Sequence, residues 1–400
     1  MPDKMKLFVL VSSLDLRHPL SATPSWWQLL KALYEEGIEL IAAPYHGPPI
    51  ESLWWKAYPN PCQREGAAFE WTRTLARNAK KNQNADTAAN GENIWDKLTR
   101  KLANAWVRPR WQTHITRLFD CETDIDAVLI LTAPLNHLTG LPGFLRERFN
   151  IPIIYYDGDV PASFPEFQGF ATGFKMYQGA DLGEYDLFLS NSKGGLTTLA
   201  EMGARQVKEL YYAADPAIFS PVTGVQQDID IFFYGHTSEY RRDWLTWMIS
   251  EPCQRLRNHH FAVRGRHLDI DLSGVQMLPY ASFSKLREYC CRSRINLNIT
   301  RSTHARTYAS STARIFELAA LGCCVVSNPI AGLEEWFEPD REMVMLTEPG
   351  EATERYTWLL NNEQVRQKLG HAARQRVLKE HTFRHRARQL IGYIQELVNA

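Results

Sequence analysis

Short apolar runs alternate with helix-length segments along most of this chain. The first run is Leu7-Phe-Val-Leu-Val11, and helical spacing of apolar residues from Trp26 to Tyr34 follows after a loop with two prolines. A run that is apolar throughout is typical of a strand buried on both faces of a parallel sheet, and parallel strands need such long connections. The pattern predicts an α/β chain built from Rossmann-like β-loop-α-β units.

The predicted strands form two groups, separated by the proline-punctuated segment from Ala213 to Pro221. We place the boundary near residue 220, so that residues 1–220 and 221–380 each hold one Rossmann-like sheet and residues 381–400 form a C-terminal helix. The expected strands are 7–11, 38–42, 127–131, 151–156, 187–189 and 209–212, then 229–234, 261–263, 275–278, 295–299, 323–327 and 343–346. The expected helices include 194–202, 243–249, 282–292, 313–321 and 384–398.

Residues 54–120 interrupt this alternation. Residues 80–91 are polar and predict a mobile loop, whereas residues 94–119 predict a basic amphipathic helix that Pro109 should break or kink. Such a helix can contact an anionic membrane or partner. The more common alternative, which we favour, is a helix docked on the core with a solvated outer face.

Composition narrows the class of protein. The chain has 400 residues with 45 Lys and Arg against 45 Asp and Glu, so it carries no net charge that would attract nucleic acid. Its seven cysteines include no C-x-x-C pair, which favours free thiols over disulfides or zinc. No apolar run reaches the length of a signal segment or membrane span, so we expect a cytoplasmic protein.

The sequence lacks a G-x-G-x-x-G motif and a Walker motif, which argues against a dinucleotide enzyme and a P-loop NTPase. Paired Rossmann-like domains usually bind ligands between the carboxyl ends of their strands. Residues that directly follow the predicted strands are therefore the candidates for a binding site.

Three segments carry longer motifs. They are Tyr185-Asp-Leu-Phe-Leu-Ser-Asn-Ser-Lys-Gly-Gly195 with Ala214-Asp-Pro216, Arg314-Ile-Phe-Glu-Leu-Ala-Ala-Leu-Gly-Cys-Cys-Val-Val-Ser327 with Gly332-Leu-Glu-Glu-Trp-Phe-Glu338, and His381-Thr-Phe-Arg-His-Arg386. In this order they resemble the inter-domain region, the donor-binding core and the terminal segment of GT-B glycosyltransferases. The resemblance is to the group 1 (family 4) enzymes and their spore-maturation-protein-like subgroup, and it covers about residues 125–395. It implies an acceptor-side first domain, a nucleotide-sugar donor domain, and a C-terminal helix that packs back toward the first domain.

The donor site should lie at the start of the predicted helix 313–321. Ser310, Ser311 or Thr312 could cap this helix, whose free N–H groups suit a diphosphate. Arg314 lies in the first turn, where the helix dipole opposes a cation unless an anion binds there. A salt bridge between Arg314 and Glu317 is the structural alternative.

Glu317 is an acid within an apolar helical segment, so it needs a partner. The resemblance implies that it binds the ribose hydroxyls of the donor, and the alternative is a structural hydrogen bond. The main family also has an acid eight positions earlier, where this chain has Ala309. That departure fits the subgroup better than the main family.

Other donor contacts are expected after neighbouring strands. The resemblance implies that Gly235 lets the backbone approach the donor and that an arginine just after it, either Arg241 or Arg242, binds the diphosphate. Arg264 ends the next strand and could line the same cleft. Exposed helix arginines are the alternative for Arg241 and Arg242, so we expect only one of the two to bind the donor.

The first domain supplies the acceptor-side candidates. Ser13 and Thr23 lie in the loop after the first strand, and His137 and Asp159 follow later strands as catalytic candidates. A lone histidine is more often structural. Asp157-Gly-Asp159 also matches the D-x-D metal signature of another glycosyltransferase architecture, but here we interpret it as a loop feature or an acceptor contact.

These residues predict a hexosyltransferase-type glycosyltransferase that moves a sugar from a nucleoside-diphosphate sugar to a hydroxyl acceptor. Arginines and a helix N-terminus would stabilise the leaving diphosphate, so no cofactor or metal is expected. The resemblance implies retention at the anomeric carbon, whereas inversion would need a base such as His137 or Asp159. The alternatives are a nucleotide-sugar epimerase and a non-catalytic nucleotide- or sugar-binding protein of the same architecture.

Overall fold

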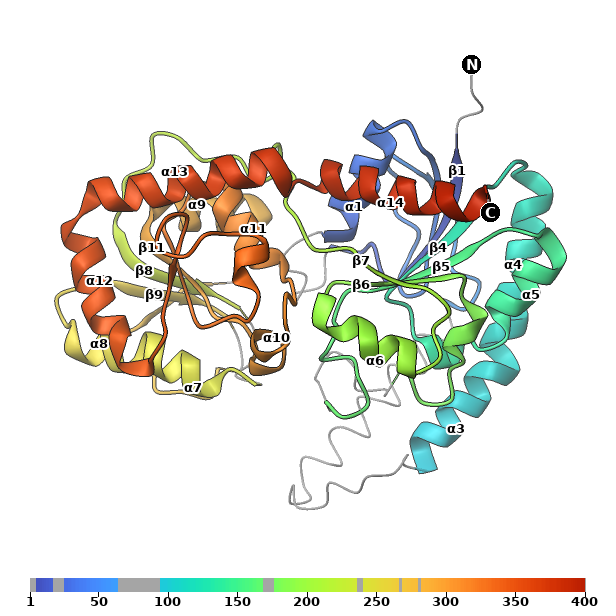
Figure 1. Ribbon diagram of the computed structural model, residues 1–400, viewed down its shortest axis with the longest axis horizontal. Helices are drawn as coiled ribbons and strands as arrows, with labels where there is room; N and C mark the ends of the chain where they lie inside the picture. Colours follow the sequence, from blue (N-terminus) through green and yellow to red (C-terminus); the bar gives the residue numbers. More distant parts are fainter. Residues whose placement is uncertain are drawn as a thin grey trace.

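The computed structural model contains two parallel sheets, each covered by helices (Figure 1). The structure describes residues 5–16, 25–63, 94–167, 176–235, 240–265, 268–279 and 282–399. The predicted mobile loop 80–91 and Thr23 lie outside these residues. The α/β prediction with two Rossmann-like units is confirmed.

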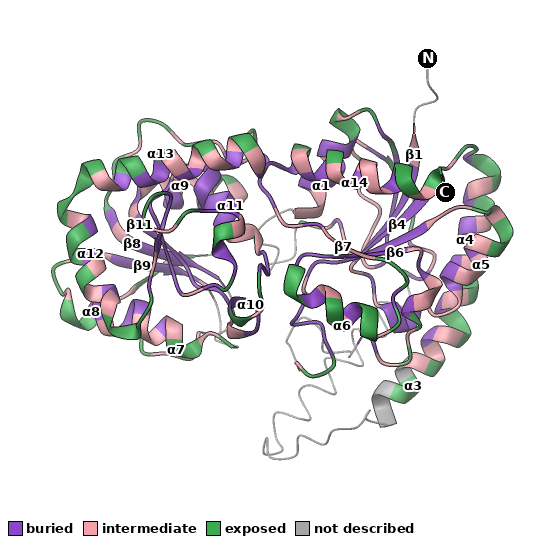
Figure 2. Ribbon diagram, in the orientation of Figure 1, coloured by how far each residue is buried: buried purple, intermediate pink, exposed green. Residues whose placement is uncertain are grey.

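The first sheet has seven strands in the order β3-β2-β1-β4-β5-β6-β7, and every neighbouring pair is parallel. Its central strands are buried along almost their whole length, because helices cover both faces (Figure 2). The strands are β1 (Lys6–Val11), β2 (Glu39–Pro44), β3 (Lys56–Ala57), β4 (Ala127–Leu131), β5 (Ile153–Asp157), β6 (Leu187–Ser190) and β7 (Val207–Glu209). The helices are α1 (Ser25–Glu35), α3 (Ile94–Leu102), α4 (Arg108–Cys121), α5 (Leu141–Phe149) and α6 (Leu196–Glu201).

The second sheet has six parallel strands in the order β10-β9-β8-β11-β12-β13. The strands are β8 (Ile229–Tyr234), β9 (Phe261–Arg264), β10 (Gln276–Met277), β11 (Ser293–Asn298), β12 (Val325–Ser327) and β13 (Val344–Met345). The helices are α7 (Arg242–Leu245), α8 (Glu251–Arg255), α9 (Phe283–Arg292), α10 (Ser302–Arg306), α11 (Ala313–Ala320), α12 (Ala352–Asn361), α13 (Glu363–Glu380) and α14 (Phe383–Val398).

The last helix returns to the first domain, as expected. Helix α13 runs along the second domain, and α14 continues past the junction to lie beside α1 (Figure 1). Its apolar face, which includes Ala387, Leu390 and Ile394, is buried in one cluster with Leu29 and Leu33 of α1. Burial of this apolar stripe joins the chain's end to its beginning.

Two helical segments widen into π-turns just before a proline. Ala103–Val107 precedes Pro109 in α4, and Thr246–Ser250 precedes Pro252 in α8. A proline has no N–H to donate, and its ring crowds the preceding turn of the helix. A wider turn before the proline relieves this crowding and accommodates the missing hydrogen bond. The interruption predicted at Pro109 therefore occurs one turn earlier, and Pro109 itself lies in the first turn of α4.

One predicted strand is displaced. The segment expected at 209–212 pairs as β7 over Val207–Glu209, the Leu210 N–H still donates to the Ser190 carbonyl of β6 at 2.8 Å, and residues 211–212 then leave the sheet. There the Tyr212 N–H donates to Ser311 Oγ at 2.9 Å instead of to a neighbouring strand. Among the described residues, no helix is both long and apolar enough to cross a membrane.

Candidate functional site

The loops at the carboxyl ends of the two sheets meet in a polar seam. Ser192, just after β6, forms an antiparallel bridge with Ser310, just before α11. The Lys193 N–H donates to the Ala309 carbonyl at 3.2 Å, and the Gly194 N–H donates to the Tyr308 carbonyl at 2.9 Å. A Cβ atom at Gly194 would lie 2.9 Å from the Tyr308 nitrogen, so only glycine permits this approach.

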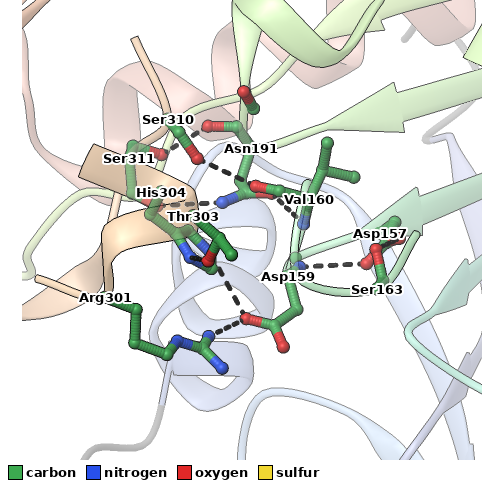
Figure 3. A network of polar contacts seen from close by, with 12 residues as sticks. Asp157, Asp159, Val160, Ser163, Asn191, Arg301, Thr303, His304, Ser310 and Ser311 are labelled. Carbon is green, nitrogen blue, oxygen red and sulfur yellow. Dashed lines mark hydrogen bonds and ion pairs between the residues drawn. The ribbon is translucent and has the colours of Figure 1, made fainter. Parts of the chain in front are cut away.

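Asn191 is the central residue of this seam (Figure 3). Its amide nitrogen donates to the Ser311 carbonyl at 2.9 Å, while its side-chain oxygen accepts from the Val160 N–H at 2.9 Å. The Ser311 hydroxyl donates to the Asn191 carbonyl at 2.8 Å, and the Ser310 hydroxyl donates to the Val160 carbonyl at 2.9 Å. All four residues are buried, so these bonds hold the domains in one arrangement.

The predicted side-chain cap on α11 is wrong. Thr312 is the N-cap residue, but its side chain makes no capping hydrogen bond, and the hydroxyls of Ser310 and Ser311 bond to the first domain instead. The first N–H groups of α11 therefore have no hydroxyl cap from these three residues. A helix start of this kind can bind an anion.

Asp159 crosses from the first domain to the second (Figure 3). Its carboxylate pairs with the Arg301 guanidinium, and the same oxygen lies 3.4 Å from Nε2 of His304. Burial tends to raise the pKa of Asp159, but Arg301 and His304 overcome it and lower that pKa. The other carboxylate oxygen, Oδ2, has no hydrogen-bond partner among the described residues.

His304 is almost fully buried, with 1% of its surface exposed. Burial, and then the neighbouring positive charge of Arg301, lower the pKa of this histidine, although Asp159 opposes the shift. His304 is therefore neutral at pH 7. A neutral imidazole can accept or donate a proton at the cleft.

Asp157 supports the loop that carries Asp159. It is fully buried, and its Oδ2 accepts hydrogen bonds from Ser163 Oγ and Tyr177 Oη, both at 2.5 Å. Its Oδ1 accepts from the Asp159 N–H at 2.9 Å. Burial raises the pKa of Asp157 to about 6. Asp157 thus fixes the backbone, whereas Asp159 reaches the second domain.

An arginine cluster, formed by Arg241, Arg301 and Arg314, lies at the carboxyl ends of β8 and β11. The Ile299 carbonyl accepts from both Arg314 Nη1 at 3.1 Å and Arg241 Nη1 at 3.4 Å. Burial lowers the pKa of Arg314, and the charge of Arg301 adds to the effect. Cations gathered where two strands end form a site of positive potential suited to an anion.

Gly235 makes room for this cluster. A Cβ atom at Gly235 would lie 3.1 Å from Arg314 Nη2 and 2.7 Å from the Phe233 ring. The Arg314 guanidinium also lies 5.2 Å from the Phe233 ring centroid and 5.1 Å from that of Tyr234. These contacts orient the Arg314 guanidinium, and the negative charge of Glu317 opposes the effect of burial on the pKa of Arg314.

The other two candidate arginines lie differently. The exposed Arg242 pairs with the exposed Asp269 at 3.4 Å, so of the two alternatives the structure brings Arg241 into the cluster. Arg264 is buried at the end of β9, with 2% of its surface exposed, and its carbonyl accepts from the Gly235 N–H at 3.0 Å.

Glu317 lies beneath the cluster and is fully buried. Its Oε2 accepts a hydrogen bond from Tyr234 Oη at 3.2 Å. Ala309 stands where the resembling enzymes have an acid, eight positions before Glu317. It is also fully buried, and its φ of 46° lies in the left-handed region. Its neighbours are backbone atoms of Gly332 and the seam, which explains why a small residue stands there.

The remaining candidates stay within the first domain. His137 is buried, and its Nδ1 lies 2.7 Å from Tyr45 Oη, an arrangement typical of a structural histidine. Ser13 lies just after β1, and its hydroxyl accepts from the Asp15 N–H at 3.2 Å. Among the described residues, no group of three or more His, Cys, Asp or Glu side chains is arranged to hold a metal ion.

A pocket of 420 Å³ adjoins the arginine cluster. Its lining combines aromatic and cationic side chains: Tyr240, Arg241, Arg242, Trp244, Trp247 and Arg306, with Asp243, Ser302, Ala305 and Pro329. Aromatic faces beside arginines suit a ligand that has an apolar ring face and a negative charge.

Sequence reasoning missed Arg301, His304 and Asn191. Arg301 and His304 lie within six residues of the end of β11, so the rule that sites follow parallel strands could have found them. Asn191 directly follows β6 inside the resembling segment. Its role depends on its distance to Ser311, which lies 120 positions away in sequence.

Comparison with known proteins agrees with this geometry. Residues 241–392 match the family model described as Glycosyl transferase-like. None of the curated proteins matches the chain by sequence.

Solved structures match over almost the whole chain. They include sucrose-phosphate synthase from Thermosynechococcus elongatus (TM-score 0.62, 12% identity, covering 98% of this chain and 99% of that one). They also include Anabaena HepE in complex with UDP and glucose (0.59, 12%, 98% and 100%) and the trehalose-6-phosphate synthase OtsA (0.62, 13%, 98% and 99%). The chain therefore has the GT-B fold of these glycosyltransferase structures, with a glycosyl transferase-like match in its second half.

Proposed function

We propose that this protein is a glycosyltransferase of the hexosyltransferase type, which transfers a sugar from a nucleoside-diphosphate sugar to a hydroxyl acceptor. The observation that carries the proposal is the arginine cluster, which faces Asp159 and His304 of the seam at the carboxyl ends of both sheets. The glycosyl transferase-like match covers all three of these arginines, and the GT-B fold agrees with it. With seven free cysteines, we place the protein in a reducing cytoplasm.

The proposed chemistry uses the cluster as a counter-charge. The diphosphate gains negative charge as the bond to the sugar breaks, so Arg241, Arg301 and Arg314 would stabilise the transition state more than the ground state. The open N-terminus of α11 would add N–H donors to the same anion. This arrangement supports a reaction that proceeds without a metal ion.

Retention at the anomeric carbon is part of the proposal. His137, the histidine considered as a base, is occupied by Tyr45 within the first domain. The Asp159 carboxylate pairs with Arg301 and has a lowered pKa, which makes it a weak base. The neutral His304 is the alternative base, and it would be required if the anomeric configuration were inverted.

Donor binding is the first test. A thermal-shift panel of UDP, GDP, TDP, ADP and CDP, without metal, should show stabilisation by one of them. A ligand at about 100 times its Kd adds roughly 2.7 kcal/mol, which raises Tm by several degrees. Arg314→Ala and Glu317→Gln should reduce the shift, whereas Arg255→Ala, which changes an exposed arginine of α8, should leave it unchanged. No shift with any diphosphate, from folded protein, would favour a protein without a donor site.

Product analysis separates the enzymatic alternatives. With the nucleotide sugar identified by binding, a transferase releases the free diphosphate only when a hydroxyl acceptor is added. An epimerase changes the sugar with no acceptor present, and a non-catalytic binding protein does neither. Proton NMR of the anomeric centre of the transferred sugar then distinguishes retention from inversion.

We also propose, against the solvated outer face that the sequence favoured for this segment, that the first domain contacts an anionic membrane through α3 and the π-turn Ala103–Val107. Trp106 is 56% exposed and Leu98 is 46% exposed, and Lys97 and Lys101 are exposed beside them. Exposed apolar side chains on a segment that also exposes lysines favour contact with a bilayer that contains anionic lipids.

Co-sedimentation with vesicles tests this membrane contact. The protein should bind vesicles that contain phosphatidylserine and not vesicles of phosphatidylcholine alone. The double variant Lys97→Glu/Lys101→Glu should lose this binding, whereas Lys379→Glu, an exposed lysine on α13, should keep it. Equal binding by wild type and the double variant would exclude this surface.

A further inference from the structure

A second pocket lies on the side of the second domain opposite the cleft. Its volume is 560 Å³, and its lining includes residues that precede β8, β11 and β12: Val225, Gln227, Cys291, Leu321, Gly322, Cys323 and Cys324. Because the strands are parallel, their amino ends lie at the edge away from the donor site. Arg294, Arg366 and Gln367 also line this pocket, which makes it polar.

Cys291 and Cys323 both line this pocket. The Val222 N–H donates a hydrogen bond to the Cys291 sulfur at 3.3 Å, and the Cys323 thiol donates to the carbonyl of Cys290, the residue before Cys291, at 3.7 Å. The bond from Val222 favours a thiolate at Cys291. The neighbouring Cys323 thiol, against the opposing effect of burial, lowers the pKa of Cys291 to about 7, and the pKa of Cys323 is raised in turn.

The other cysteines around the pocket are not activated in this way. Burial raises the pKa of Cys290, and it raises the pKa of Cys324 to about 12. Cys291 is also the partly exposed member of this group, whereas Cys290, Cys323 and Cys324 are buried. Reactivity follows thiolate character and access, and both properties coincide at Cys291.

We propose that Cys291 and Cys323 are a redox-active pair that forms a reversible disulfide on reaction with a small-molecule disulfide. The Cys291 thiolate attacks one sulfur of the reagent, which forms a mixed disulfide and releases one thiolate. Cys323 then passes its proton to the released thiolate and attacks the Cys291 sulfur, which releases the second thiolate. In total two protein thiols are oxidised and one small disulfide is reduced to two thiols.

Alkylation measures the first property of the pair. The reduced full-length protein is treated with limiting iodoacetamide at a series of pH values, and the labelled cysteines are quantified by peptide mass spectrometry. Cys121, which is exposed at the end of α4, is the internal control. At pH 7 we expect Cys291 to react at least about fivefold faster than Cys121, because an ordinary thiol titrates near 8.5. A Cys291 rate equal to or below that of Cys121 would overturn the proposal.

Oxidation measures the second property. After treatment with oxidised glutathione, wild type should yield a peptide pair joined through Cys291 and Cys323, which dithiothreitol separates. Cys323→Ser should instead accumulate glutathione on Cys291, and Cys324→Ser, a neighbour in the same pocket, should behave as wild type. A mixed disulfide that persists on wild-type Cys291, or a disulfide between other cysteines, would contradict the pairing. These readouts do not depend on donor binding or transfer.

Discussion

Asp159 holds the position in the arginine cluster that an anionic ligand would compete for. Its carboxylate neutralises part of the charge of Arg301 in the ligand-free structure, and its side chain is only 20% exposed. Partial burial of this kind strengthens the attraction between the two groups relative to a surface pair. A diphosphate that binds Arg301 must therefore share it with this carboxylate.

The first prediction is that Asp159→Asn binds the cognate nucleoside diphosphate more tightly than wild type. Removal of the negative charge frees Arg301 and reduces repulsion of the ligand, which should lower Kd about five- to tenfold, or ~1–1.4 kcal/mol. Isothermal titration calorimetry gives the Kd, and Arg301→Ala should raise it. Asp120→Asn, an exposed aspartate of α4, is the matched control. Weaker binding by Asp159→Asn would mean that Asp159 organises Arg301 for the ligand.

Site residues could be identified from the sequence only where they lie directly next to the end of a predicted strand or the start of a predicted helix. Arg314 and Gly235 were found because each lies next to the end of a predicted strand or the start of a helix, and the structure brings both together. Ser310 and Ser311 were found at the same place, but their hydroxyls bond to Val160 and Asn191 of the other domain. Partners that lie more than 100 positions away leave no local pattern in a single sequence.

Elements are easier to predict than residues because apolar periodicity is local. Strands β4 and β8 agree with the predicted ranges residue for residue, since β4 is a fully buried apolar run and β8 is buried at every position except Asp230. The π-turns before Pro109 and Pro252 were not predicted, because both helices keep their apolar face through the wider turn. Edge strands such as β7 end where tertiary contacts take over their hydrogen bonds.

At the scale of secondary-structure elements, Glu122 connects helix α4 to strands β1 and β3. It caps the C-terminus of α4 and accepts hydrogen bonds from Lys6 of β1, Lys56 of β3 and Tyr58, the bond from Tyr58 being 2.6 Å long. Burial tends to raise the pKa of this 7%-exposed carboxyl, but its three partners overcome that effect and lower the pKa to about 2. The carboxylate form is therefore the one that stabilises the fold.

We predict that Glu122→Gln is destabilised at pH 7 by about 1–2 kcal/mol. This is less than the free energy that the whole pKa shift of Glu122 would correspond to, because its partner Lys56 is exposed to solvent and the interaction between them is screened. A carboxyl with a lowered folded pKa contributes its stability above the unfolded value of 4.5 and loses it as pH falls toward 2. Urea unfolding at several pH values should show the difference shrinking below pH 4.5. Glu147→Gln, an exposed residue of α5, should match wild type throughout. A difference that does not change with pH would indicate lost packing in place of lost charge.

At the scale of the whole molecule, the chain passes between the two domains twice, once near Ala214 and once near residues 381–383, and the two segments lie side by side. The Ala214 N–H donates to the His381 carbonyl, and the Phe383 N–H donates to the Ala214 carbonyl, so the outgoing and returning chain segments are paired. The His381 ring packs against Phe316 and Phe337 of the second domain, with centroids 5.6 and 5.9 Å apart. Any movement between the domains must therefore turn about this pair of segments.

The return of α14 makes the end of the chain part of the first domain's core, and Leu390 tests this. Leu390 is fully buried against α1, so Leu390→Ala should cost about 2–5 kcal/mol, with the loss confined to the first domain. Hydrogen exchange resolved by peptide should increase in α1, α14 and β1 to β7, while β8 to β13 keep their protection. Val398→Ala, at a position 46% exposed on the same helix, should change neither stability nor exchange. Equal loss of protection in both sheets would contradict this prediction. It would show instead that the seam at Asn191 and Ser311 couples the two domains into one unfolding unit, because the buried hydrogen bonds of the seam would then break only when both domains unfold.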